Sequence, residues 1–287
     1  MKSRIYFMTF AIIMGVFSLN AAPASVVTDG LVSYWPFDNE HFINDTVKDV
    51  WGNNNGTLRG NPKVVPGHVG EALAFDGAGD FVNLTTLGDF GKKIGSFTFE
   101  AWIKTSNETD WMTLINTHGE ECPYWGIELN GVKNKDGLHR GTRRIFFGNS
   151  FLNEKNRKKG CETLFVGSGS LNIYEGEWHH IVYIYEHLME EEKGKEFTYI
   201  DTMPKGKGTI SLADEWTSFP FTEPVHLGAR NFRGKSDGYF EGMIDEVRFY
   251  DRPLTADEVI QNFESTEPYN VAPKGKLSTV WGALKAK

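Results

Sequence analysis

The chain has 287 residues, a formal net charge of −8 and 14% aromatic residues. This length suffices for one large β domain or two small domains, and the aromatic residues supply the apolar side chains of a sizeable core. The acidic balance argues against a general nucleic-acid-binding protein.

The N-terminal residues 1–24 have the pattern of a secretory signal peptide. Lys2 and Arg4 precede an apolar run from Ile5 to Leu19, and Ala22-Pro23-Ala24 is a small-residue cleavage site. The apolar run is short for a membrane span, so we expect cleavage after Ala24 rather than an uncleaved anchor. The mature protein is then secreted, extracellular or held at the cell surface, without a later membrane span.

Residues 25–265 are expected to form one β domain. Short apolar runs alternate with polar residues and are bounded by Gly, Asn, Asp or Pro, which is typical of strands joined by turns. Many short strands without alternating helices predict an all-β, two-sheet antiparallel jelly-roll sandwich. The main expected strands are Leu31–Trp35, Ala72–Phe75, Phe81–Leu84, Phe97–Lys104, Trp125–Leu129, Arg144–Phe147, His179–Tyr185, Phe197–Ile200, Val225–Leu227 and Met243–Tyr250.

Aromatic residues in or beside predicted loops are candidate sugar platforms, because a pyranose face packs on an aromatic ring. Trp111, Tyr124 and Trp125 lie at such positions, and we predict them as ligand-binding residues. Trp35 and Trp178 are expected to pack in the interior, which is the commoner role of a Trp in a sandwich.

Cys122 and Cys161 are the only two cysteines. An even number in an oxidising compartment favours a disulfide, and two buried free thiols are the alternative. The segment 131–160 between them is strongly basic and suits an anionic polysaccharide, with Arg143 and Arg144 as candidate contacts. A solvated loop that balances nearby acids is the alternative. The basic residues of segment 131–160 are Lys133, Lys135, Arg140, Arg143, Arg144, Lys155, Arg157, Lys158 and Lys159.

The last expected strand carries a carboxylate in an unusual position. Alternation over Met243–Tyr250 puts Asp245 on the same face as Met243, Val247 and Phe249. A carboxylate among apolar side chains is costly unless a positive or hydrogen-bonding group meets it.

One short C-terminal helix is expected after this strand. Thr255-Ala256-Asp257-Glu258 is a capping box, and Val259, Ile260 and Phe263 form its apolar face. We expect the helix to pack against an edge of the sandwich. Residues 266–287 are expected to be a linker and a short tail.

Seven segments, in this order, resemble the LamG-like jelly-roll domains of the concanavalin A-like lectin/glucanase sandwiches. The resemblance covers about Leu31–Phe263. Thr202 stands where this family usually has Gly, which predicts a longer or differently shaped turn. The segments are 31–38, 74–82, 96–104, 177–182, 199–201, 227–230 and 239–250.

The resemblance implies a domain that binds glycans or protein partners outside cells. Related sandwiches often carry a structural Ca²⁺ that joins the terminal strands, and Asp38 and Asp245 match those positions. Ca²⁺ takes six to eight oxygen ligands, and the loop 52–56 would supply carbonyls. The alternative is that Asp245 accepts backbone N–H bonds and that no metal is present.

Catalysis is not expected. Glycoside hydrolysis needs two positioned carboxyl groups, and the Glu-x-Asp-x-x-Glu strand of the glucanase branch is missing. His179 and His180 are neighbours on a strand, so they point to opposite faces. We therefore predict a non-catalytic carbohydrate-binding or adhesion module. The alternatives are a protein–protein or surface-assembly module and a polysaccharide-cleaving enzyme with an unrecognised site.

Overall fold

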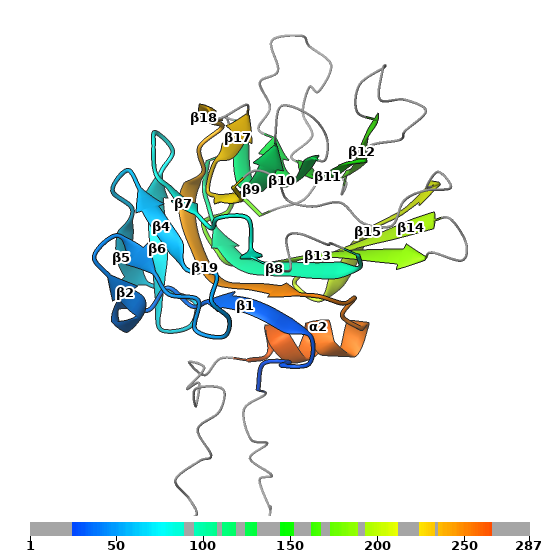
Figure 1. Ribbon diagram of the computed structural model, residues 1–287, viewed down its shortest axis with the longest axis horizontal. Coiled ribbons are helices and arrows are strands. Elements are labelled where there is room, and N and C mark those ends of the chain that lie inside the picture. Colours follow the sequence, from blue (N-terminus) through cyan, green and yellow to red (C-terminus); the bar gives the residue numbers. More distant parts are fainter. Residues whose placement is uncertain are drawn as a thin grey trace, which may run out of the picture.

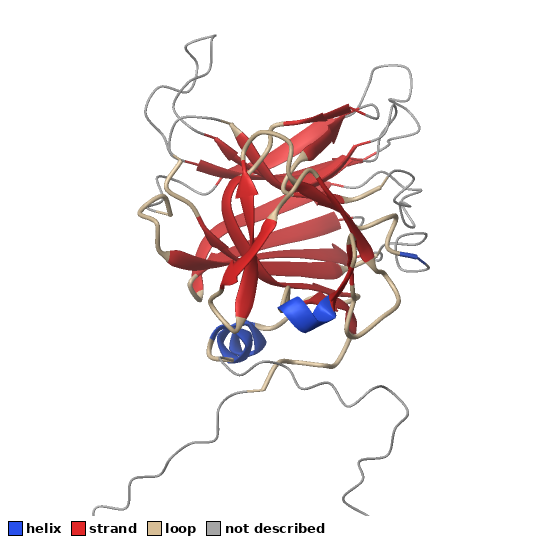
Figure 2. Ribbon diagram, turned by 90° about the vertical axis from the view of Figure 1, so that its left-hand side faces the viewer, coloured by secondary structure: helices blue, strands red, loops and turns tan. Residues whose placement is uncertain are grey.

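The computed structural model describes residues 25–88, 95–107, 111–118, 124–130, 144–151, 162–167, 173–188, 193–211, 224–232 and 235–265. These residues form two antiparallel sheets packed face to face, with helix α2 (Ala256–Phe263) against the outer side of one sheet (Figures 1 and 2). The predicted sandwich is confirmed. The predictions for residues 1–24, residues 266–287, Cys122 and Cys161 lie outside the described residues.

The first sheet has eight strands in the described part of the chain, in the order β15-β14-β13-β8-β19-β6-β5, with β1 paired to β19. The N-terminal strand thus lies beside the C-terminal one. The strands are β1 (Leu31–Trp35), β5 (Lys63–Pro66), β6 (Glu71–Asp76), β8 (Phe97–Lys104), β13 (Trp178–Leu188), β14 (Lys193–Ile200), β15 (Met203–Ser211) and β19 (Glu241–Tyr250).

The second sheet has nine strands among the described residues, in the order β12-β11-β10-β9-β16-β7-β4-β3-β2. Its strands are β2 (Phe42–Ile43), β3 (Thr46–Val47), β4 (Gly56–Arg59), β7 (Phe81–Asn83), β9 (Met112–His118), β10 (Tyr124–Asn130), β11 (Arg144–Phe151), β12 (Glu162–Gly167) and β16 (His226–Leu227). The remaining elements are the 3-10 helix η1 (Asn39–His41) and the hairpin of β17 (Arg230–Phe232) and β18 (Lys235–Asp237).

The core lies between the two sheets and is rich in aromatic rings. Strand β8, which has the bounds expected from the sequence, turns Phe97, Phe99, Ala101 and Ile103 into the core. Trp125 also lies there, fully buried, with its ring centroid 5.3 Å from that of Phe97. The prediction of Trp125 as a sugar platform is therefore wrong, because strand β10 turns its indole inward and no face of it is exposed.

The face assignment of β19 changes at a β-bulge. Asp245 pairs with Trp102 and Arg248 pairs with Glu100, so β19 carries one extra residue there, and Glu246 has φ 54°. Ile244 and Val247 both point into the core. The prediction that Asp245 shares a face with Val247 and Phe249 is wrong, because the bulge places Asp245 on the outer face of the sheet.

Helix α2 begins at the predicted capping box. Thr255 Oγ1 accepts the Glu258 N–H at 3.3 Å, and the Glu258 carboxylate accepts the Thr255 N–H at 2.8 Å. The helix packs on the outer face of the eight-stranded sheet rather than at an edge, and it buries Val259 and Asn262, whereas Ile260 is 40% exposed. Among the described residues, no helix has the length and apolar character needed to cross a membrane.

The turn at Thr202 is not longer than usual. Ile200 pairs with Met203, so the β14–β15 hairpin has only two turn residues, Asp201 and Thr202, with φ 49° and 68°. Two central residues with positive φ are typical of a type I′ turn. A longer turn, one of the two alternatives expected at Thr202, is therefore excluded.

Candidate functional site

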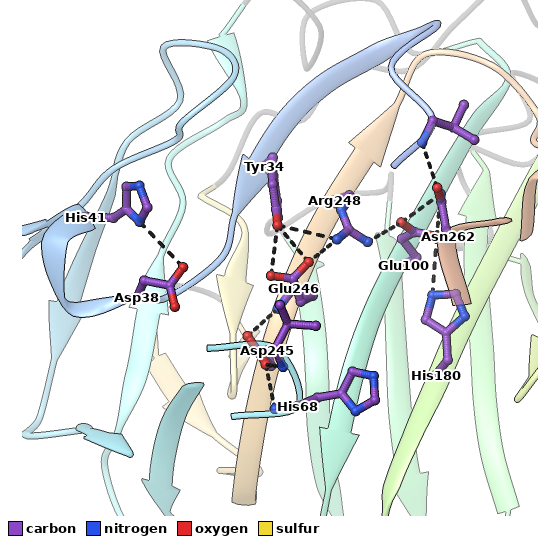
Figure 3. Close-up of polar contacts among 12 residues, drawn as sticks. Tyr34, Asp38, His41, His68, Glu100, His180, Asp245, Glu246, Arg248 and Asn262 are labelled. Atoms are coloured by element: carbon purple, nitrogen blue, oxygen red, sulfur yellow. Dashed lines mark hydrogen bonds and ion pairs between the residues drawn. The ribbon is translucent and has the colours of Figure 1, made fainter. Parts of the chain in front are cut away.

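A buried charge network lies on the outer face of the eight-stranded sheet, beneath α2 (Figure 3). Arg248 is 1% exposed, and its Nη1 donates to Glu100 Oε1 at 2.8 Å. Its Nη2 contacts the Glu246 carboxylate. Tyr34 Oη donates to Glu246 at 2.7 Å, and the Arg248 guanidinium stacks 4.6 Å above the Tyr34 ring. One guanidinium thus serves two buried carboxylates.

Helix α2 completes this network through Asn262. Asn262 Nδ2 donates to both Glu100 oxygens, at 3.0 and 3.1 Å, and Asn262 Oδ1 accepts the Val27 N–H at 2.8 Å. His180 Nε2 lies 3.3 Å from Glu100. Burial would raise the pKa of Glu100, but the bond to His180 and the charge of Arg248 lower it to about 2. These carboxylates are covered and neutralised, which suits a structural role.

Asp245 is fully buried beside this network. Its Oδ2 accepts the N–H groups of His68 at 2.9 Å and Val69 at 3.1 Å, and its Oδ1 accepts the Glu246 N–H at 2.8 Å. Burial and the neighbouring Glu246 raise the pKa of Asp245 to about 8, although the three N–H donors act in the opposite direction. Asp245 therefore has the environment of the second alternative given by the sequence, in which it accepts hydrogen bonds from backbone N–H groups.

The groups around Asp38 and Asp245 do not fit a Ca²⁺ ion. Asp38 Oδ1 accepts the Glu71 N–H at 2.9 Å. The loop expected to offer carbonyls instead points the N–H groups of Gly52 and Asn54 at the buried Asp49, at 2.8 and 3.0 Å. No group of three His, Cys, Asp or Glu side chains in the described residues is arranged to hold a metal. Backbone donors, not acceptors, surround these carboxylates.

A rim of the sandwich holds a different kind of site. Two crossovers meet there: the segment that follows β8, of which residues 105–107 are described, and residues 238–240, which lead from β18 into β19. Asn107 Nδ2 donates to Glu241 Oε2 at 2.6 Å, and Thr105 Oγ1 donates to the Glu241 carbonyl at 2.7 Å. Trp111 packs on Gly238, where an added Cβ would come within 2.7 Å of the indole. The two crossovers thus brace each other.

A pocket of about 250 Å³ lies beside these crossovers. Its floor includes Ala74 and Met243, and its polar side chains come from Lys104, Ser106 and Glu241. Other residues that line the pocket are Phe75, Thr105, Asn107, Gly176 and Gly242. An ammonium, a hydroxyl, an amide and a carboxylate therefore meet around an apolar floor, which suits a polyhydroxylated ligand.

Trp111 packs on the second crossover, at Gly238. It is half-buried, its Nε1 donates to Glu128 at 3.1 Å, and the guanidinium of Arg230 lies 4.2 Å from the centroid of its ring. Arg230 in turn forms a two-bond ion pair with Asp237. The predicted residue Trp111 does not line this pocket, and cationic Arg230 covers one face of its ring.

The other predicted ligand residues lie elsewhere. Tyr124 and Arg144 are the first residues of β10 and β11, where Arg144 pairs with Asn130. Arg143 lies outside the described residues, as does most of the basic segment 131–160. The prediction of an anionic partner for that segment stays a prediction.

The histidine pair behaves as expected from strand alternation. His180 is fully buried on the outer face beside Glu100, whereas His179 pairs with Asp201 through Nδ1 at 2.7 Å. The described residues place no Ser or Cys nucleophile in contact with either ring through a hydrogen bond. Sequence reasoning did not predict Lys104, Asn107 and Glu241 as site residues. The only indication in the sequence is that they lie at or next to the ends of expected strands.

Comparison with known proteins identifies the family to which this fold belongs. The model of the concanavalin A-like lectin/glucanases superfamily matches residues 76–260. No curated protein matches this chain.

Solved structures with low sequence identity share the architecture. Domain 4 of AbnA, an extracellular arabinanase from Geobacillus stearothermophilus, has a TM-score of 0.54 and 18% identity, over 82% of this chain and 98% of that domain. The binding domain of botulinum neurotoxin DC has a TM-score of 0.55 and 14% identity, over 85% of this chain and 53% of the other. A Trypanosoma rangeli sialidase has a TM-score of 0.55 and 18% identity, over 84% of this chain and 34% of the other. At these identities the likeness shows the fold alone.

Proposed function

This chain belongs to the concanavalin A-like lectin/glucanase superfamily, and we propose that it is a secreted, non-catalytic module that binds a glycan in the rim pocket. The observation that carries the proposal is the pocket itself, in which the side chains of Lys104, Ser106, Asn107 and Glu241 meet beside an apolar floor. Sugar hydroxyls need both donors and acceptors, and this set offers both.

The pocket is also preorganised. The Asn107–Glu241 bond and the Thr105 bond to the Glu241 carbonyl fix two of its walls without a ligand. Gly242 forms part of the lining with φ 144°, and a side chain there would collide with the backbone of Lys104. A wall that is already ordered loses little conformational entropy when a ligand binds.

Solved relatives support a glycan ligand. The arabinanase domain was solved in complex with arabinotriose, the neurotoxin binding domain with SialylT, and the sialidase with sialic acid. This chain spans about half of the toxin chain and a third of the sialidase chain, so those proteins' activities are not assigned to it.

The small number of described carboxylates that line the pocket supports a non-catalytic role. Glu241 is the one carboxylate that lines the pocket in the described part of the chain. Glycoside hydrolysis uses two carboxyl groups on either side of the scissile bond. The described carboxylates of the network, Glu100 and Glu246, are buried against Arg248 and offer no second group to the pocket.

The test is a glycan array followed by calorimetric titration of the best ligand. We expect Asn107→Ala and Glu241→Gln each to weaken binding about tenfold, because the first removes an amide and the second replaces a charged acceptor of sugar hydroxyls by a weaker neutral one. Asn61→Ala and Glu264→Gln, at exposed positions away from the pocket, are matched controls with unchanged affinity.

Three results would contradict the proposal. Equal affinity of pocket and control variants would remove the pocket from the site. Capture of a protein partner without binding to any glycan would favour a surface-assembly module. Release of reducing ends from a polysaccharide panel would identify an enzyme.

A further inference from the structure

A single row of residues crosses five neighbouring strands beside the pocket. Trp178 pairs with Lys104, Lys104 with Met243, Met243 with Ala74, and Ala74 with Lys63. The residues come from β13, β8, β19, β6 and β5, which are consecutive in the sheet. Directly opposed residues of paired strands point to the same face, so all five side chains lie on the outer face.

Every residue of the row is at least partly exposed. Lys63 is exposed, and Ala74, Met243, Lys104 and Trp178 are half-buried. At a strand spacing of about 4.8 Å, Lys63 and Lys104 lie roughly 14 Å apart, and Trp178 lies one strand further. Short side chains and the flexible Met243 occupy the space between the two lysines. The row is therefore a strip long enough for a short oligosaccharide.

The next row is closed. Asp245, Trp102 and His180 pair across β19, β8 and β13, and all three are buried. The His68 ring covers Trp102 at a centroid distance of 3.5 Å. The loop that carries His68 thus forms a wall along one side of the open row.

Acidic groups border the opposite side. Glu241 pairs with Asp76 at the end of β19 and β6. Glu241 accepts the Asn107 amide, and Asp76 accepts the Ala78 N–H at 2.8 Å. By contrast, neither Lys63 nor Lys104 forms an ion pair among the described residues. The two ammonium groups are free to meet an external anion, while the acids face one edge of the strip.

Edge protection explains only one of these lysines. Lys63 lies on β5, at the end of the sheet, where a charged residue discourages pairing with another chain. Lys104 lies on β8, an interior strand with neighbours on both sides. Lys104 lines the pocket and has no sheet edge to protect.

We propose that the ligand of this module is a linear anionic glycan that lies across the strands along this row. Its carboxylate or sulfate groups would meet Lys104 and Lys63, a sugar ring would pack beside Trp178, and hydroxyls would face Glu241. This inference rests on the proposed glycan-binding function, because one end of the row is the pocket. It adds the charge and the direction of the ligand.

The experiment compares charged and neutral forms of the same polymers by affinity electrophoresis and calorimetry with the full chain. Polygalacturonate is paired with its fully methyl-esterified form, and dextran sulfate with dextran, so that the two pairs separate carboxylate from sulfate recognition. We expect a charged polymer to bind at least about tenfold more tightly than its neutral form, with affinity falling as salt is raised.

Lysine variants locate the charge effect. Lys63→Gln lies outside the pocket and is expected to weaken binding of the charged polymer about fivefold, because it removes one screened charge contact. Lys205→Gln, an exposed lysine on the distant edge strand β15, is the matched control and should not change affinity.

The outcomes separate the two proposals. Equal binding of charged and neutral polymers, or no effect of Lys63→Gln, would overturn the anionic inference while the pocket variants still weaken glycan binding. Glycan binding that Asn107→Ala and Glu241→Gln leave unchanged would instead overturn the proposed function. Affinity that is independent of salt would also contradict recognition by Lys63 and Lys104.

Discussion

Strands β8 and β19 carry charges in two regions of one sheet face, and the two regions use them differently. Under α2, Glu100, Glu246 and Arg248 are buried and paired with one another. At the other end of the same strands, Lys104 is half-buried, Glu241 is exposed, and both line an open pocket. The difference follows from burial. A charge that is buried beneath α2 must be compensated inside the protein, whereas a charge that lines an open pocket is available to a ligand.

The largest effect should follow from removing the shared cation of the covered region. Arg248→Met leaves Glu100 and Glu246 buried without their guanidinium, which should lower the free energy of unfolding by about 3–5 kcal/mol. Urea denaturation measures this change. Lys104→Met, in the open region, is the control and should change stability by no more than about 0.5 kcal/mol. A similar loss of unfolding free energy in both variants would show that the two regions do not differ in their need for internal charge compensation.

The contact of α2 with the network should have an intermediate effect. Asn262→Ala removes the amide nitrogen that donates to both Glu100 oxygens and the acceptor of the Val27 N–H, so we expect a loss of about 1–3 kcal/mol. The exposed Glu264→Ala, near the end of the same helix, should be close to neutral. If Asn262→Ala is as mild as Glu264→Ala, the helix does not hold the network together.

Much of this fold could be predicted from alternation and turn chemistry. The bounds of β8 and the capping box of α2 are local properties of the sequence, and the structure confirms both. The face of Asp245 could not be predicted, because a bulge at Glu246 shifts the alternation and only the pairing with β8 reveals it. The same limit applies to Ile260, which the pattern assigns to the packed face but the helix leaves exposed.

The candidate site was harder to predict than the fold. Trp111 stood out as an aromatic residue beside a loop, but it does not line the pocket. Lys104, Asn107 and Glu241 have no motif, since they come from separate segments that meet only where the two crossovers touch. The alignment of Lys63 with Lys104 across two intervening strands likewise depends on the order of strands in the sheet, which cannot be read from the spacing of residues in the sequence.

The covered region should also respond to pH through Asp245. Its pKa is raised from 3.8 to about 8, so the folded protein binds this proton more tightly than the unfolded chain between those values. The stabilisation from this group is present at low pH and is lost as pH rises through the folded pKa. We expect Asp245→Asn, measured by urea denaturation across this range, to lose less stability with rising pH than the unaltered chain.

The His68 ring contributes with the opposite sign and must be separated from this effect. Burial and the charges of His180 and Arg248 lower the pKa of His68 to about 4, so its contribution to stability rises with pH between about 4 and 6.5. The difference between the unaltered chain and Asp245→Asn removes this shared term. A difference that stays constant with pH would show that Asp245 is ionised in the folded state.

The smallest expected effect is that of Ca²⁺. A metal that bound the folded state at Asp38 and Asp245 would raise the melting temperature with its concentration, and a chelator would lower it. Asp245 instead accepts three backbone N–H groups, and Asp38 accepts the N–H of Glu71. We therefore expect the same melting temperature with Ca²⁺ and with EDTA. A shift of several degrees that Asp245→Asn abolishes would mean that the 67–70 loop rearranges to coordinate the ion, and the carboxylate would then be a metal ligand rather than an anchor for that loop.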